Sequence, residues 1–303
     1  MSQQPILFKD AAAEPMRQPF PDWARSVLGS PRTNAPTSLK SHRSFDDLSD
    51  AEPYGLVGPF AYLLPITPTE LAAMSPFLGP MINLTDHRKA ALSPTQIQLR
   101  KLLKRFGSSL SRDSIVADLS CNDGEFARCF SHCRYLAMDI WPPSLTAGLR
   151  KGQIKFGVLA DVRSPPLVPQ SLDAFVSTST MCHLPDDQIP DAAVNLLRFI
   201  KPGGRVAMTV PAGLGDRVAA KIPSGYELLE REITGGELEH FWGRTVSRRT
   251  DQLIRRLPSD FFQKATAAVQ NRLSAVVAVA ARLRPGTPRQ GCDSDWLVVR
   301  KLL

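Results

Sequence analysis

Apolar and polar positions in the middle of the chain follow two different periods, and the changes between them mark the predicted elements. Ile115–Leu119 is a short run of apolar and β-branched residues, which is typical of a buried strand. Small, turn-forming residues follow at 120–124. Four apolar residues then recur at i, i+3, i+4 and i+7, which predicts one face of a helix: Phe126, Cys129, Phe130 and Cys133. A second apolar run, Tyr135–Ile140, completes a strand–turn–helix–strand unit.

The chain from residue 93 onward repeats this alternation of helices and strands. Ser93 is followed by a proline and has Gln96 three residues on, which is the sequence of a capping box, and the helix that it starts is expected to end at Gly107. A later helix, Pro190–Ile200, ends at the turn Lys201–Gly204 because proline cannot continue a helix. Further strands are predicted at Gln153–Asp161, Ser171–Ser177, Arg205–Val210 and Asp295–Leu302.

Residues 212–290 are dominated by charge and by one long helical pattern. Glu227–Glu239 is rich in Glu and Phe241–Leu257 carries five Arg, which predicts a solvated helix face, with an anion-binding surface as the alternative. Ser259 is the expected cap of a helix that runs to Leu283. Its narrow apolar stripe could dock on the sheet, form part of a substrate lid or make a dimer contact, and consists of Phe262, Val269, Leu273, Val276, Ala280 and Leu283.

Residues 1–92 are a different kind of sequence. Twelve of the 26 prolines lie there, with little periodicity over residues 1–50, which predicts an extension that is partly disordered or draped over the core. Tyr54–Leu84 is more apolar, but prolines interrupt it, so short helices are expected, the clearest at Thr69–Met74.

Charge and cysteine content limit the compartment and the partners. The net charge of +8 suits an anionic partner or reflects an Arg-rich proteome, and the dispersed basic residues favour the second. No run of 18 apolar residues and no signal-peptide pattern is present, which predicts no membrane span. Five cysteines without metal-ligand spacing predict a reduced, cytoplasmic protein without a metal site.

The turn at 120–124 lies where a doubly wound α/β sheet binds its ligands, at the carboxyl end of a strand. Asp139 ends the next strand about 20 residues after Asp118, which is the separation expected of an acid that binds ribose hydroxyls. A dinucleotide site needs G-x-G-x-x-G to hold a pyrophosphate, whereas this turn has Ser120, Asn122 and Gly124. Three nearby acids would repel a pyrophosphate and suit a cationic ligand with a free amine: Asp118, Asp123 and Glu125.

On these residues the stretch resembles the first motifs of the class I (Rossmann-fold) S-adenosylmethionine-dependent methyltransferases, usually D-x-G-x-G-x-G. Ser120 and Asn122 stand in place of two of the usual glycines. Thr178–Asp186 is similar to the family's loop that faces the transferred methyl, and Lys201–Gly204 with the strand after it is also similar to a family segment. The resemblance covers residues 115–211, about a third of the chain.

The resemblance implies an α/β fold: a doubly wound, mostly parallel, seven-stranded sheet with an antiparallel last strand inserted at the sheet edge. A Pro-rich N-terminal extension (1–92), acting as a lid over the substrate or a cap on the sheet, precedes a methyltransferase domain (93–303). Within that domain, a helical C-terminal insertion (212–290) is the variable substrate or lid region.

The resemblance also implies S-adenosylmethionine as cofactor. The turn and Asp118 would hold its amino-acid tail, Asp139 its ribose, and Asp161 with Val162 its adenine. His183 is the candidate catalytic residue, because histidine is suited to proton transfer near neutral pH, with a structural role as the alternative. The full set of expected cofactor-binding residues is Asp118, Ser120, Cys121, Asn122, Gly124, Asp139, Ile140, Asp161, Val162, Ser177 and Thr178.

The predicted function is methyl transfer from S-adenosylmethionine to an O, N or C atom of a small molecule, such as a specialised metabolite or a sugar. The positive charge and the arginines at 244–256 support a nucleic-acid or protein methyltransferase as the alternative. Ser120 and Asn122 motivate a third hypothesis, a non-catalytic Rossmann-type scaffold or partner subunit. No membrane partner is expected, and a homodimer through the 259–283 helix is one expected assembly.

Overall fold

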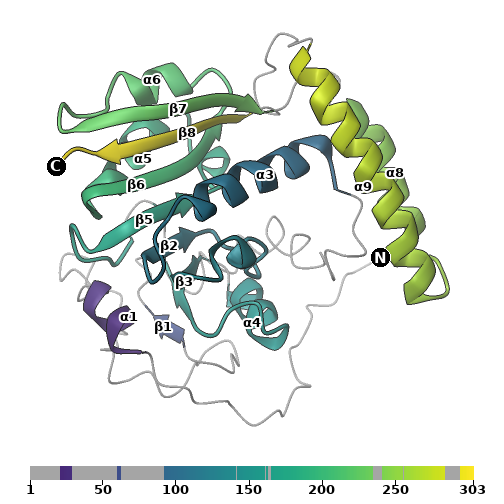
Figure 1. Ribbon diagram of the computed structural model, residues 1–303, viewed down its shortest axis with the longest axis horizontal. Helices are drawn as coiled ribbons and strands as arrows, with labels where there is room; N and C mark the ends of the chain where they lie inside the picture. Colours follow the sequence, from purple (N-terminus) through teal and green to yellow (C-terminus); the bar gives the residue numbers. More distant parts are fainter. Residues whose placement is uncertain are drawn as a thin grey trace, which may run out of the picture.

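The computed structural model describes residues 21–28, 60–62, 92–140, 142–160, 162, 165–234, 241–254, 256–283 and 294–303. In these residues one eight-stranded sheet lies between helices on both of its faces (Figure 1). The strand order is β1-β4-β3-β2-β5-β6-β8-β7. The strands are β1 (Phe60–Tyr62), β2 (Ile115–Leu119), β3 (Arg134–Asp139), β4 (Gly157–Leu159), β5 (Leu172–Ser177), β6 (Ile200–Pro211), β7 (Tyr226–Thr234) and β8 (Ser294–Lys301).

Strand pairing confirms the predicted doubly wound fold. Strands β1 to β6 pair in parallel, and the last strand, β8, is antiparallel to both of its neighbours. The predicted position of the last strand at the sheet edge is wrong, because β8 lies between β6 and β7 and leaves β7 as the edge. The extension adds an eighth strand to the seven expected, since β1 pairs with the otherwise open edge of β4.

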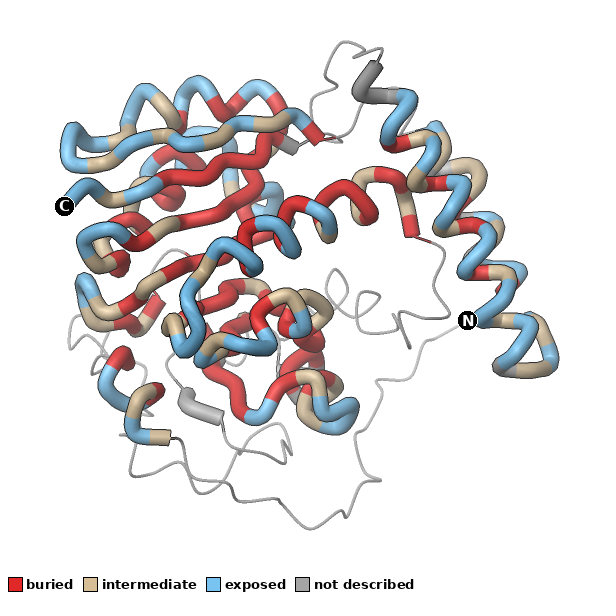
Figure 2. Tube along the Cα trace, viewed as in Figure 1, coloured by how far each residue is buried: buried red, intermediate tan, exposed pale blue. Residues whose placement is uncertain are grey.

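Large apolar side chains fill the space between the sheet and its helices. On one face α3 buries Leu102, Leu103 and Phe106 against β2, β5 and β8. On the other face α1 and α5 cover the opposite sides of the same strands. Figure 2 shows this continuous buried layer along the central strands. The helices are α1 (Asp22–Val27), α3 (Pro94–Ser108), η4 (Ala127–Phe130), α4 (Pro142–Arg150), η5 (Met181–His183), α5 (Ile189–Leu197), α6 (Gly215–Ala219), η6 (Trp242–Ser247), α8 (Arg248–Ile254) and α9 (Asp260–Leu283).

Helix α3 begins at the predicted capping box. The Ser93 hydroxyl accepts a hydrogen bond from the Gln96 backbone N–H at 3.2 Å, and the Gln96 side-chain oxygen accepts from the Ser93 N–H at 2.8 Å. Two N–H groups that the helix leaves unpaired are therefore satisfied. The predicted end near Gly107 is also confirmed, because α3 ends at Ser108.

The helix predicted between β2 and β3 is wrong. This segment forms turns and the short 3₁₀ helix η4 instead. Asp, Gly, Phe, Cys and Ser make up much of it, and all are weak helix formers. The end of α3 also approaches closely, since a Cβ on Gly107 would overlap the Cys129 carbonyl oxygen. Phe130 is buried against α3, while Cys129 and Cys133 are half-buried.

The helix predicted for the Glu-rich stretch is also wrong, because residues 226–234 form strand β7. Burial alternates along it with a period of two residues, as in a strand with one solvated face. Polar partners on α3 meet the half-buried acids: Arg105 bonds Glu230, and the Gln98 amide donates to Glu232 at 2.9 Å. Region 212–290 therefore contributes a sheet strand as well as helices.

Several smaller boundaries differ from the sequence predictions. Strand β4 is only three residues long, and β6 begins at Ile200, before the predicted turn. That turn is a break in register inside the strand, with Gly203 at φ +77°. The predicted helix at Thr69–Met74 lies outside the described residues. None of the described helices is long and apolar enough to cross a membrane.

Candidate active site

Four adjacent parallel strands end along one edge of the sheet, and most of the predicted cofactor residues follow them. Leu119, near the end of β2, is in register with Met138 on β3 and with Ser177 on β5. Asp139 is in register with Leu159 on β4. The loops after these strands therefore meet at one carboxyl edge, which is where doubly wound sheets bind ligands.

The loop after β2 has a backbone that glycine normally supplies. Ser120, Asn122 and Gly124 have φ of +67°, +53° and +80°, so every second residue of the loop is left-handed. This conformation costs an ordinary residue roughly 1–2 kcal/mol, although Asn adopts it more readily. Non-glycine residues held in this region are concentrated at functional sites. The loop thus has the left-handed backbone typical of glycine at three positions, of which only one is a glycine.

Asp118 is fully buried beneath this loop. Its Oδ2 accepts a hydrogen bond from the Tyr135 hydroxyl at 2.5 Å, and its Oδ1 has no hydrogen-bond partner among the described residues. Burial raises the pKa of Asp118 to about 7, the Tyr135 bond lowers it in part, and the nearby Asp139 and Glu125 carboxylates raise it. A buried, partly unpaired carboxyl group at a strand end is a candidate ligand-binding group.

Asp139 ties the ends of the first two loops together. Its Oδ2 accepts from the Asn122 backbone N–H at 2.8 Å, and its backbone carbonyl accepts from the Ala160 N–H at 2.9 Å. The first bond fixes Asn122 in its left-handed conformation. Asp139 is itself buried, so its carboxylate lies at the base of the edge and not on the outer surface.

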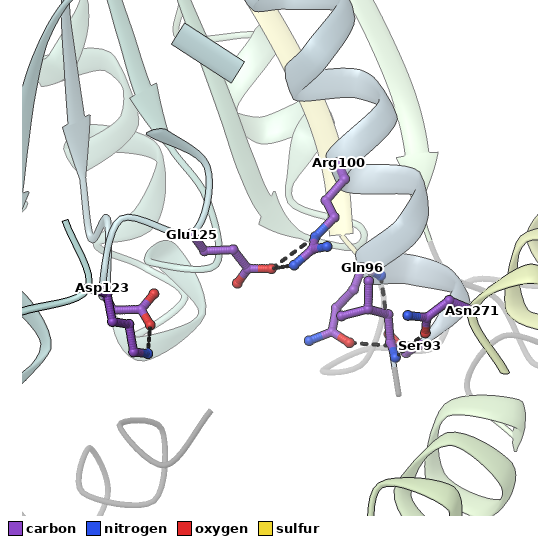
Figure 3. A network of polar contacts seen from close by, with 8 residues as sticks. Ser93, Gln96, Arg100, Asp123, Glu125 and Asn271 are labelled. Atoms are coloured by element: carbon purple, nitrogen blue, oxygen red, sulfur yellow. Dashed lines mark hydrogen bonds and ion pairs between the residues drawn. The ribbon is translucent and has the colours of Figure 1, made fainter. Parts of the chain in front are cut away.

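The other two acids of the loop are neutralised by basic residues that are distant in the sequence but adjacent in the fold. Lys151 donates to Asp123 at 2.6 Å, and the Arg100 Nε donates to Glu125 at 3.0 Å. Figure 3 shows the Arg100 and Glu125 side chains pointing at each other. Of the three acids that suggested a cationic ligand, only Asp118 has no basic partner among its described hydrogen bonds and ion pairs. The charge available to a ligand is therefore smaller than the sequence suggested.

Hydroxyl groups join the end of β5 to the end of β2. The Ser177 hydroxyl donates to the Thr180 hydroxyl at 3.1 Å, and Thr180 donates to the Leu119 carbonyl at 3.3 Å. Ser179, which lies between them in the loop, is left-handed at φ +56°, and its backbone N–H donates to the Thr209 hydroxyl at 2.7 Å. Thr178 is buried beside them. These bonds fix the loop that the sequence placed against the acceptor.

The remaining predicted residues occupy different depths. The His183 side chain is exposed on η5, and the His183 backbone N–H donates to the Thr180 carbonyl at 3.0 Å. Cys121 and Val162 are buried, and Ile140 is half-buried. Asp161 lies outside the described residues. No group of three or more potential metal ligands occurs in the described parts of the chain.

A family model described as a methyltransferase domain matches residues 117–208, which run from β2 into β6. The matched segment contains the left-handed loop, Asp118, Asp139 and the His183 loop. This segment is therefore similar to a methyltransferase domain. No curated protein sequence matches the chain well enough to count as a relative.

Solved structures resemble parts of this chain at low identity. An N-methyltransferase, NodS, from Bradyrhizobium japonicum WM9, in complex with S-adenosyl-L-homocysteine, has 13% identity and a TM-score of 0.49, over 75% of this chain and 98% of that one. A putative sarcosine dimethylglycine methyltransferase from Galdieria sulphuraria has 17% identity and a TM-score of 0.46, over 68% and 85%. The [4+2]-cyclase SpnF has 14% identity and a TM-score of 0.49, over 78% and 97%.

Three residues of the matched segment support the site and were not predicted from the sequence. Tyr135 was assigned only to an apolar strand, yet it is in register with Val116 and so shares a sheet face with Asp118. Strand parity could have revealed that bond. Thr180 and Lys151 carried no comparable signal, because their partners come from other strands and helices.

Proposed function

We propose that this protein transfers a methyl group from S-adenosylmethionine to a small-molecule acceptor. The observation that carries the proposal is the loop at 120–124, where Ser120 and Asn122 adopt the left-handed backbone that glycine normally supplies. That finding also weakens the case for a non-catalytic scaffold, which rested on the loss of glycines at these positions. The family match over residues 117–208 supports the same assignment.

The described residues offer the cofactor hydrogen-bond acceptors at the expected positions. S-adenosylmethionine carries a sulfonium and an ammonium, and Asp118 offers a buried carboxyl oxygen that has no hydrogen-bond partner among the described residues. Asp139 would take the ribose hydroxyls, since each carboxylate oxygen can accept more than one hydrogen bond. The pairing of Asp123 with Lys151 and of Glu125 with Arg100 holds the loop itself.

When bound, the cofactor supplies a methyl group already activated by a positive sulfur. The protein's own contribution is then mainly to hold the two reactants in line and to exclude water. The rigid hydroxyl network of Ser177 and Thr180 would position the acceptor loop. His183, exposed on that loop, would accept a proton from an acceptor that must lose one.

The charge distribution supports a small acceptor over a nucleic acid. Many described basic side chains are already paired with acids, including Arg100, Arg105, Lys151, Arg231 and Arg300. Each pair is neutral, so it leaves the net charge of +8 unchanged but makes these side chains less available to contact a phosphate backbone. The N-terminal extension and the 212–290 region would enclose the acceptor.

A thermal melt with S-adenosylmethionine and its demethylated product tests the cofactor. At about 100 times its dissociation constant a ligand adds about 2.7 kcal/mol, so we expect a rise in Tm of about 5 °C with either ligand. Asp139→Ala should abolish the rise. Glu227→Ala, which removes an exposed carboxylate at the start of β7, at the opposite end of the sheet, should keep it.

The melt also separates the alternatives. No shift with either ligand for a folded wild-type protein would support the scaffold hypothesis. A shift that is equal in Asp139→Ala and wild type would mean that the ligand binds elsewhere. Transfer of labelled methyl to nucleic acid or protein, with binding that weakens steeply as salt rises, would replace the small-molecule acceptor with the macromolecular one.

A further inference from the structure

Helix α9 contacts the rest of the protein through a face made of small and polar side chains. Ala267, Gln270, Ser274 and Ala278 are buried on this face. The Ser274 hydroxyl accepts from the Trp242 indole N–H at 2.9 Å and from the Gln270 amide at 3.2 Å. The Trp242 bond and a bond from the Gln270 amide to the Ser247 hydroxyl at 3.3 Å anchor α9 to η6.

The opposite face of α9 is apolar and open to solvent. At about 100° per residue the exposed side chains lie nearly opposite the buried ones. Six of them are between 48% and 74% exposed: Phe261, Phe262, Val269, Leu273, Val276 and Val279. Most of the stripe predicted from the sequence is therefore real in its spacing but faces outward. Figure 1 shows α9 with α8 at the far end of α3, away from the sheet.

This arrangement reverses the usual order of an amphipathic helix, in which apolar residues face inward. Monomeric proteins rarely expose a contiguous apolar patch of more than a few hundred Å². At about 170 Å² for a fully exposed large side chain, the six residues offer on the order of 600 Å². Two such faces together would bury about 1,200 Å², the lower end of the range for specific interfaces.

The spacing of the exposed residues favours a helix as the partner. Phe262, Val269 and Val276 are seven residues apart, and Leu273 and Ala280 follow the last two by four. A repeat of seven with a second apolar position is the seam of two packed helices. A helix that lies on a bilayer instead needs basic residues along its polar face. Here that face is occupied by Gln270 and Ser274 in contact with the protein.

From this face we infer that the protein forms a homodimer in which the α9 helices of two copies pack against each other. Each copy supplies the same apolar seam, so one two-fold axis closes the contact without leaving a face open. Lys264 and Arg272 are exposed on α9, and both are basic. Association brings like charges together, so the dimer should tighten as salt is added, whereas binding to an anionic bilayer should weaken.

Sedimentation equilibrium of the full chain tests the inference. We expect twice the chain mass of 33.3 kDa for the wild type. The double variant Val269→Glu, Val276→Glu buries unpaired charges in the seam and should weaken the dimer by about 100-fold or more. Leu229→Glu places the same change on the exposed side of β7 and should leave the dimer intact. Circular dichroism checks that each variant folds, and Val269→Ser with Val276→Ser replaces the Glu pair if it does not.

Three results would overturn the inference. The first is a wild-type monomer at every concentration that remains in solution. The second is a folded double variant that dimerises as tightly as the wild type. The third is a monomer that floats with vesicles of equal phosphatidylcholine and phosphatidylserine and is released by about 1 M salt, which would assign the α9 face to lipid.

Discussion

Helices α3 and α9 carry similar apolar patterns in the sequence, yet they turn opposite faces to the protein. α3 buries Leu99, Leu102, Leu103 and Phe106 against the sheet. α9 buries Ala267 and Ser274 and exposes its larger apolar side chains. An apolar stripe thus reports which face of a helix seeks a partner, but not whether that partner is in the same chain.

The two contacts also differ in what holds them. Burying one large apolar side chain contributes about 1.5–3 kcal/mol, so α3 is held by several such terms. The anchor of α9 is hydrogen bonds, each worth about 0.5–1.5 kcal/mol net. We therefore expect the sheet with α3 to be the most stable unit and α9 to open at lower free energy.

Truncating a leucine on each helix gives the largest contrast. Leu102→Ala should lower the free energy of unfolding by about 2–5 kcal/mol, because Leu102 is buried and its removal leaves a cavity. Leu273→Ala should change it by no more than about 0.5 kcal/mol, because Leu273 is about half exposed. Urea unfolding at a protein concentration that keeps the chain monomeric measures both. Equal losses would mean that the face of α9 is covered within one chain.

The accuracy of the sequence predictions also differs between two kinds of feature, those set by neighbours close in sequence and those set by distant residues. The capping box and the positions of β2 and β3 depend on neighbours close in sequence, and they were correct to within one residue. The helix predicted at 126–133 does not form, although its apolar residues have helical spacing. Its residues are weak helix formers, and α3 approaches closely at Gly107. The helix predicted for the Glu-rich stretch was wrong because a partner of its acids, Arg105, lies more than 100 residues away in the sequence.

The predictions for the site divide in the same way, into local and long-range features. The small residues at 120–124 predicted a turn, and the structure has one there, in which Ser120 and Asn122 are left-handed. The neutralisation of Asp123 by Lys151 and the bond from Tyr135 to Asp118 need the folded sheet, and no local pattern encodes them. The roles of these residues toward the cofactor stay predictions.

A second contrast concerns titration, because the sheet buries a carboxyl group whereas α9 buries amide and hydroxyl groups. The pKa of Asp118 is about 7 in the folded protein and 3.8 without burial, so the native state binds the proton more tightly. Its stabilising contribution is complete below about pH 4 and is lost as the pH rises through 7. At about 1.36 kcal/mol per pH unit, stability should fall by about 3 kcal/mol between pH 5 and pH 8.

Urea unfolding of the wild type and of Asp118→Asn across this range measures the effect. Asn cannot ionise, so the difference between the two proteins should shrink or reverse toward pH 8. Tyr135→Phe removes a bond that lowers the pKa of Asp118 and should extend the loss to higher pH. A difference that stays constant from pH 5 to pH 8 would show that the buried Asp118 is ionised throughout.

Backbone strain gives a third contrast, since left-handed residues occur in the sheet loops but not in the described part of 241–283. Gly124→Ala combines φ of +80° with a Cβ that would lie 2.5 Å from the Ile154 Cγ2. We expect a loss of about 2 kcal/mol or more. Gly152→Ala has φ of +63° with nothing within 4 Å and should cost about 1 kcal/mol. If denaturant unfolding shows the same loss of free energy for both variants, the Ile154 side chain moves aside at no measurable cost.

The smallest expected effect tests the polar anchor of α9 itself. Ser274→Ala removes the acceptor of the Trp242 indole N–H and of the Gln270 amide, at a cost of about 1–2 kcal/mol. Because α9 opens apart from the sheet, this loss should appear as faster hydrogen exchange in 260–283, with little change in global unfolding. Ser26→Ala, which removes a bond from an exposed serine to its own helix, should leave exchange in α9 unchanged. Equal loss of protection in the sheet and in α9 would mean that the two regions unfold as one unit. The contrast between an apolar and a polar anchor would then have no consequence for stability.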